Sequence, residues 1–105
     1  METLLTLNEL LREALAHGGI GFTLRAGRHP LIYSAKGVQT YDTRSSSSED
    51  IEELLRRLMS SRQMREFRAQ GVIRFTSMFE GSIPLRGEAK IEGDDIHVEI
   101  RKMSA

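Results

Sequence analysis

The chain has 105 residues, of which 39% are hydrophobic and 29% are charged. This size and composition are typical of one compact globular domain, here residues 1–105, and leave little room for a second core. Fifteen lysines and arginines balance fifteen acidic residues, so no overall positive field attracts nucleic acid or anionic lipid. The absence of cysteine excludes a disulfide framework and a thiolate metal site.

The first 17 residues mix leucines with charged residues, which predicts an amphipathic helix. Its apolar positions follow the i, i+3, i+4 spacing of one helix face: Leu7, Leu10, Leu11, Ala14 and Leu15. The segment Thr6 to Glu9 has the spacing of a capping box, and Gly18-Gly19 marks the helix end. Because charges interrupt the leucines, we expect no signal peptide and no membrane insertion, and we expect a cytoplasmic protein.

Three short runs of strand-forming residues come next, at 20–25, 30–35 and 38–41. Turn signals at Ala26-Gly27 and Lys36-Gly37 separate them, so we expect a small antiparallel meander. The serine tract 45–48 is long enough for a loop and predicts the start of a helix.

Two consecutive short helices are predicted after the serines. The first has acidic residues in its first turn, where the helix dipole favours them, and one apolar face: Ile51, Leu54, Leu55, Leu58 and Met59. Ser60 to Gln63 is a second capping-box match, so we expect a break at Ser60. The third helix then carries Met64 and Phe67 inward and ends at Gly71.

The apolar period changes to two after Gly71, which predicts a half-buried strand with Phe75 and Phe79 on its inner side. A hairpin with one charged face follows, around the turn at 92–95. Cross-strand charge favours a register with Lys90 opposite Glu99, whereas the alternative, two residues away, places Ile91 opposite Ile96. The complete order is helix, three strands, two helices, three strands. We therefore expect an α+β sandwich with a mainly antiparallel sheet and helices on one face.

The chain lacks the residue patterns of an enzyme or a cofactor site. No glycine-rich loop ends in Gly-Lys-Ser/Thr, and Gly18 to Gly21 precedes a strand, so these glycines indicate a turn and not a phosphate site. His17, His29 and His97 have no local metal-ligand spacing. The serine tract has no neighbouring base. We expect no catalytic residue, no cofactor and no metal.

Arginines are the remaining candidates for a partner surface. Five of them could hold an anionic partner: Arg25, Arg28, Arg62, Arg65 and Arg68. Interspersed glutamates and only six aromatic residues argue against a nucleic-acid platform. A solvated face is the simpler interpretation for these side chains.

Four segments stand out along the chain: Leu7 to Leu11 (LNELL), Ala16 to Gly19 (AHGG), Leu24 to Pro30 (LRAGRHP) and Glu49 to Leu55 (EDIEELL). In the same order, they resemble the start of the PilT-type ATPases of twitching motility and type II secretion. The resemblance continues through the last hairpin and implies a PAS-like N-terminal domain without its RecA-like ATPase domain. Such a domain packs against the ATPase domain of a neighbouring hexamer subunit.

The resemblance also implies which residues face a partner. In the family, arginines of this domain help to complete the nucleotide site between subunits, and Arg86 and Arg101 stand at matching positions. The alternative for these two residues is cross-strand pairing with Glu99 and Glu88. Two departures weaken the likeness: Ile20 to Leu24 replaces the family's Ser-Asp-Leu-His-Leu, and Pro84 to Glu88 replaces Arg-Phe-Arg-Val-Asn. We take Arg25, Arg28, Arg86 and Arg101 as the candidate partner interface.

Three functions follow from these patterns. The first is a non-catalytic interaction or regulatory domain that docks on a type IV pilus or type II secretion motor ATPase. The second is a PAS-like sensor with a ligand in the apolar interior, lined by Phe22, Tyr33, Phe67 and Phe75. The third is a homo-oligomer in which the edge of the last hairpin pairs with another copy.

Overall fold

The computed structural model describes residues 7–16, 18–40 and 47–103. Along these residues the helices and strands follow one another in the predicted order. The elements are α1 (Leu7–Ala16), β1 (Gly19–Arg25), β2 (Leu31–Ser34), β3 (Gly37–Thr40), α2 (Ser48–Leu58), α3 (Ser61–Gln70), β4 (Val72–Phe79), β5 (Ile83–Glu92) and β6 (Asp95–Lys102). The expected α+β order is confirmed. Thr6 of the first capping box, His17, Tyr41 and the first two serines of the tract fall outside the described residues.

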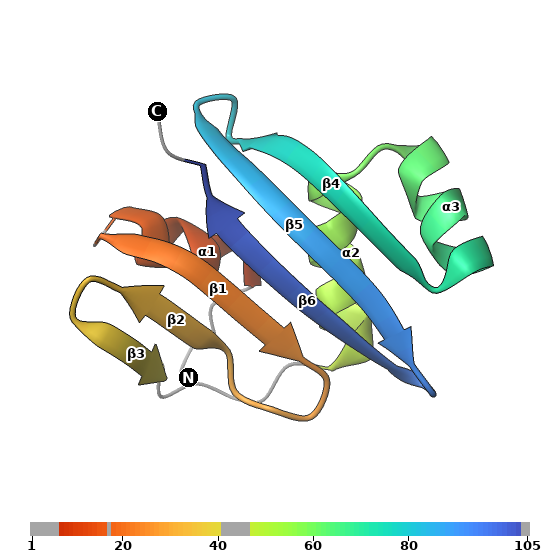
Figure 1. Ribbon diagram of the computed structural model, residues 1–105, viewed down its shortest axis with the longest axis horizontal. Coiled ribbons are helices and arrows are strands. Elements are labelled where there is room, and N and C mark those ends of the chain that lie inside the picture. The colour runs from red at the N-terminus through yellow and green to blue at the C-terminus, as the bar shows by residue number, and fades with distance from the viewer. Residues whose placement is uncertain (1–6, 17, 41–46, 104–105) are drawn as a thin grey trace, which may run out of the picture.

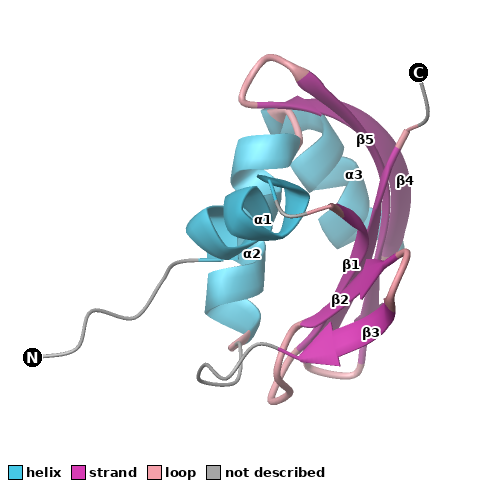
Figure 2. Cartoon of the chain, turned by 90° about the vertical axis from the view of Figure 1, so that its left-hand side faces the viewer, coloured by secondary structure: helices cyan, strands magenta, loops and turns pink. Residues whose placement is uncertain are grey.

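The six strands form one antiparallel sheet in the order β3-β2-β1-β6-β5-β4 (Figure 1). Figure 2 shows the three helices together on one side of this curved sheet. The other side of the sheet carries none of the described helices. The fold is thus two layers, with the core between them and one sheet face left open.

Both predicted helix starts in the middle of the chain have complete caps. The Ser47 hydroxyl accepts a hydrogen bond from the Asp50 backbone N–H at 3.1 Å, and the Asp50 carboxylate accepts one from the Ser47 N–H at 3.2 Å. Ser60 and Gln63 repeat this arrangement at the start of α3. Gly71 ends α3 with a φ of 76°, a conformation that glycine adopts without steric cost.

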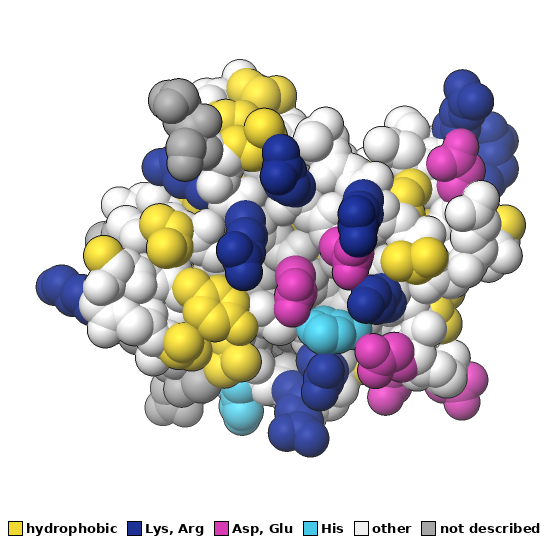
Figure 3. All heavy atoms as spheres, in the orientation of Figure 1, with side chains coloured by type: hydrophobic (Ala, Val, Ile, Leu, Met, Phe, Trp, Pro, Cys, Tyr) yellow, Lys and Arg dark blue, Asp and Glu magenta, His cyan; other side chains and the backbone are white. Residues whose placement is uncertain are grey.

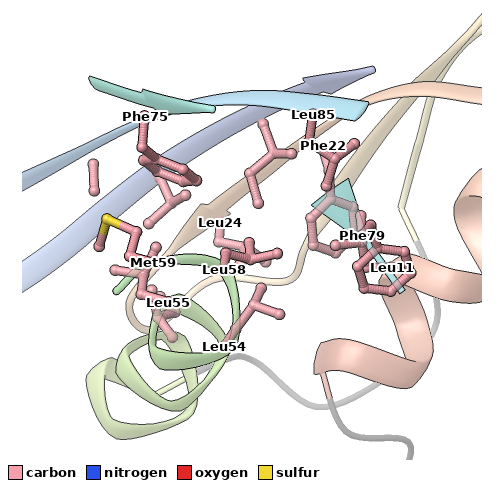
Figure 4. Close-up of a cluster of buried hydrophobic side chains, with 14 of the residues drawn as sticks. Leu11, Phe22, Leu24, Leu54, Leu55, Leu58, Met59, Phe75, Phe79 and Leu85 are labelled. Carbon is pink, nitrogen blue, oxygen red and sulfur yellow. The ribbon is translucent and has the colours of Figure 1, made fainter. Parts of the chain in front are cut away.

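The apolar faces of the helices pack against the inner face of the sheet (Figure 4). Phe22, Phe67 and Phe75 lie in this core and are at most 4% exposed. Tyr33, which we expected beside them, instead points to the open face, because it alternates with the buried Ile32 along β2. The prediction that these four aromatics line one interior space is wrong for Tyr33.

The register of the last hairpin differs from the one that cross-strand charge favoured. Ile91 lies opposite Ile96 and Glu88 opposite Glu99. The turn explains this choice: only two residues separate Glu92 from Asp95, and Gly93 adopts a φ of 64°. A tight turn of this kind sets the register, whereas the favoured alternative would pair Gly93 with Ile96 and leave Asp94-Asp95, without a glycine, as the two turn residues.

The last hairpin occupies the middle of the sheet and not its edge. Strand β6 pairs with β1 on one side, and β5 pairs with β4 on the other. Both strands of the hairpin therefore have their backbone groups paired within the chain. Self-assembly through an exposed edge of this hairpin, as the sequence suggested, is excluded.

Candidate functional site on the open sheet face

The open sheet face consists of the side chains that alternate with core residues along the strands. Its central members come from four strands: Thr23 and Arg25 of β1, Arg74 and Thr76 of β4, Arg86, Glu88 and Lys90 of β5, and His97, Glu99 and Arg101 of β6. Figure 3 shows basic and acidic side chains next to one another across the middle of this face.

Strand pairing arranges the charges of β5 and β6 in rows of like sign. Arg86 lies directly opposite Arg101, and Glu88 lies directly opposite Glu99. Like charges at opposed positions of an antiparallel pair are destabilising. The fold therefore keeps an arrangement on its open face that sheet stability does not favour.

The two glutamates of the acidic row, Glu88 and Glu99, differ in how closely basic side chains approach them. Glu88 accepts a hydrogen bond from Arg74 Nε at 2.8 Å and lies 3.4 Å from Lys90 Nζ. The hydrogen bond from Arg74, with a smaller contribution from Lys90, lowers the pKa of Glu88. Glu99 lies at a longer distance, 4.0 Å, from His97 Nε2. The partners of Glu88 thus come from β4 and its own strand.

Arg86 and Arg101 have no carboxylate within 4.0 Å among the described residues, so the pairing with Glu99 and Glu88 that we considered is absent. Both arginines line an open hollow of about 590 Å³, whose other polar lining residues are Arg74, Thr76, Gln63, Glu88 and Glu99. Their guanidinium groups keep their N–H donors available to an outside acceptor. This is the chemistry expected of an anion-binding or acidic-partner surface.

A second hollow, of about 460 Å³, lies towards the β1–β2 turn and brings together the other two predicted arginines, Arg25 and Arg28. It also contains His29 and His97, which the sequence left on separate elements. Among residues 7–16, 18–40 and 47–103, no group of three His, Asp or Glu side chains could hold a metal ion.

The remaining arginines named from the sequence lie on helix α3, away from these hollows. Arg62 pairs with Glu66 at 3.6 Å, Arg68 pairs with Glu52, and Arg65 lies in the groove between α2 and α3. The four residues of the predicted interface therefore divide into two pairs on one side of the molecule, Arg86 with Arg101 and Arg25 with Arg28. Arg74 was missed, although the alternating pattern already placed it on the outer side of its strand. Tyr33 was named from the sequence as a lining residue of the interior and lies on the open face instead.

Within the described ranges, no helix has the length and apolar content to cross a bilayer.

Comparison with protein-family models finds no match, and no curated protein matches the chain. Solved structures do match. The pilus retraction motor PilT, in a crystal structure with bound ADP, superposes with a TM-score of 0.81 and 18% identity over 96% of this chain. The Legionella pneumophila ATPase DotB superposes with a TM-score of 0.77 and 16% identity over 99% of this chain. The chain has the fold of a motor-ATPase N-terminal domain.

The chain spans only 30% of the PilT chain and 31% of the DotB chain. The likeness covers the N-terminal part of these ATPases and not their catalytic domain. The resemblance predicted from the sequence is therefore confirmed for the fold.

Proposed function

We propose that the protein is a non-catalytic docking domain that binds a type IV pilus or type II secretion motor ATPase and regulates it in the cytoplasm. The superposition on PilT over nearly the whole of this chain, but less than a third of that motor, carries the proposal. Hydrolysis of ATP needs a phosphate-binding loop, and these 105 residues contain no Gly-Lys-Ser/Thr sequence. The domain would therefore act on the catalysis of its partner.

The open sheet face is the proposed contact surface, with Arg86 and Arg101 as its main residues. Two guanidinium groups on directly opposed residues, without a carboxylate within 4.0 Å among the described residues, cost stability in the free domain. A partner that presents acidic side chains or phosphate oxygens offsets this cost, because arginine binds such groups through paired N–H donors. Arg25 and Arg28 extend the basic surface at the other end of the face.

The acidic row restricts which partner fits. Glu88 and Glu99 lie between the Arg86–Arg101 row and the row of Lys90 and His97. A partner with a uniformly acidic surface meets repulsion from the two glutamates, whereas one with matching alternation of charge does not. Such complementarity contributes more to specificity and association rate than to total affinity.

The test is ATP turnover of the hexameric motor from the same cell, measured with increasing amounts of this domain. We expect wild-type domain to change the turnover rate in a saturable way. The double variant Arg86→Gln/Arg101→Gln should need at least roughly tenfold more protein for the same effect, because charge-assisted hydrogen bonds contribute about 1.5–3 kcal/mol each.

Arg65→Gln removes one arginine from helix α3 and is the matched control, which should act like the wild type. Equal effects of wild type and double variant would reject the open sheet face as the docking surface. Turnover that no amount of domain changes, together with no measurable binding, would reject the proposed function.

A further inference from the structure

The hollow beside the β1–β2 turn has an excess of positive charge that the described residues do not neutralise. Arg25 and Arg28 line it, and neither has a carboxylate within 4.0 Å among these residues. Arg25 Nη2 instead lies 3.5 Å from His97 Nδ1, so two nitrogen-rich groups adjoin. His29 lines the same hollow. The hollow is therefore suited to an anion.

The hollow is also held in shape by its surroundings. Pro30, which is almost fully buried, follows the turn and restricts the backbone there. The Arg28 backbone N–H donates to the Arg25 carbonyl at 3.0 Å, which closes the turn that carries both arginines. Cationic groups positioned in this way lose less conformational freedom when a ligand binds.

One wall of the hollow is an aromatic ring. Tyr33 belongs to β2, and its ring lies over Gly21 of the neighbouring strand β1. Gly21 leaves space for the ring, because a Cβ at residue 21 would stand 3.2 Å from Tyr33 Cδ2. The Thr23 hydroxyl, at 3.0 Å, hydrogen-bonds with the Tyr33 hydroxyl and holds the far end of the ring. Leu31 adds an apolar side chain beside it. The ring offers its outer side to a flat apolar group.

We propose that this hollow binds a small phosphomonoester whose phosphate is attached to a planar ring. The phosphate carries a charge of about −1.5 to −2 at neutral pH, which matches two guanidinium groups without a carboxylate partner among the described residues better than the single charge of a carboxylate does. Arg25 and Arg28 hold the phosphate, and Tyr33 packs against the ring of the ligand. The hollow's volume, about 460 Å³, is within the range of small-molecule sites.

Among the described residues that line the hollow, Glu99 is the one acidic side chain, and it opposes the bound phosphate. It lies 4.0 Å from His97 Nε2, and Glu92 lies 3.8 Å from His97 Nδ1, so His97 already has carboxylate neighbours. Because the Glu99 carboxylate repels a bound phosphate, removal of its charge should strengthen phosphate binding. A substitution that improves affinity is a sharp test, because damage to the fold cannot produce it.

The test is a titration of the isolated chain, followed by backbone amide NMR shifts, with phenyl phosphate as the probe. Inorganic phosphate lacks the ring, and benzoate keeps the ring with a single charge. We expect phenyl phosphate to bind roughly tenfold tighter than either, with shifts centred on residues 25–33 and on His97. Arg28→Gln should weaken binding roughly tenfold, and Glu99→Gln should tighten it several-fold. Arg65→Gln should leave it unchanged.

Three results would overturn this assignment. One is unchanged phenyl phosphate affinity in Arg28→Gln and in Arg25→Gln. Another is equal affinity for inorganic phosphate and phenyl phosphate, which would remove the role of Tyr33. The last is much tighter binding of a phosphotyrosyl peptide than of phenyl phosphate, which would assign the site to a protein ligand. No motor ATPase takes part in the titration, so its outcome is independent of the docking proposal.

Discussion

Gly87 lies on the inner side of β5, beneath the ring of Phe75, and this contact provides a direct test of the packing. A Cβ placed on Gly87 would stand 2.3 Å from Phe75 Cζ, 2.7 Å from Cε1 and 2.9 Å from Cε2. Phe75 is only 4% exposed, so its ring cannot move into solvent. The substitution Gly87→Ala must therefore displace a buried ring or the strand that carries it.

The free energy of unfolding should fall by about 1–2 kcal/mol. Overpacking of a core usually costs roughly 1–3 kcal/mol, and the lower entropy of the unfolded alanine chain offsets about 0.4–1 kcal/mol. For a domain of this size, Tm should fall by roughly 4–16 °C. Urea denaturation followed by circular dichroism measures the change.

Two further variants make the result decisive. In a Phe75→Leu background the ring atoms that Gly87→Ala would meet are gone, so the alanine should cost close to nothing. Gly21→Ala is the matched control, because the half-exposed Tyr33 ring can move away from the new methyl group. An equal loss in the presence and absence of the Phe75 ring would refute the contact that we describe.

Two predictions concern the helices. Ser60→Ala removes the N-cap of α3 and should lower the free energy of unfolding by about 1 kcal/mol, with the exposed neighbour Ser61→Ala as a near-neutral control in the same urea assay. The hydrogen bond from Arg68, aided by Arg56, lowers the pKa of Glu52 below 4.5. This contribution is present above pH 4.5 and is lost as the pH falls below it. Glu52→Gln should therefore flatten the stability profile at acidic pH by at most about 1 kcal/mol; an unchanged profile would contradict the contact.

Local signals in the sequence were sufficient for most of the fold. The capping box at Ser60 satisfies N–H groups that only a helix start leaves unpaired, so it marked the start of α3 correctly. The serine tract 45–48 marked the start of α2, where the structure shows Ser47 as the cap. The period-two pattern after Gly71 depends only on which residues alternate, and it identified β4 with its inner face. The likeness to motor ATPases agreed with this order of elements.

The errors arose where distant elements decide the outcome. The hairpin register was predicted from charge alone, whereas the turn at Gly93 sets it, and Arg74 of β4 supplies a partner for Glu88 that no inspection of the hairpin reveals. The central position of the hairpin in the sheet depends on β1 pairing with β6, across more than 70 residues. The same pairing brings His97 beside Arg25 and creates the second hollow.

The affinity of this domain for a hexameric pilus or secretion motor ATPase tests the central claim most directly. Fluorescence anisotropy of the labelled domain, titrated with the motor, gives this affinity for wild type and for Arg86→Gln/Arg101→Gln. The account predicts saturable binding that weakens roughly tenfold or more in the double variant and leaves Arg65→Gln unaffected. Binding of equal strength in all three proteins, or in none of them, would contradict it.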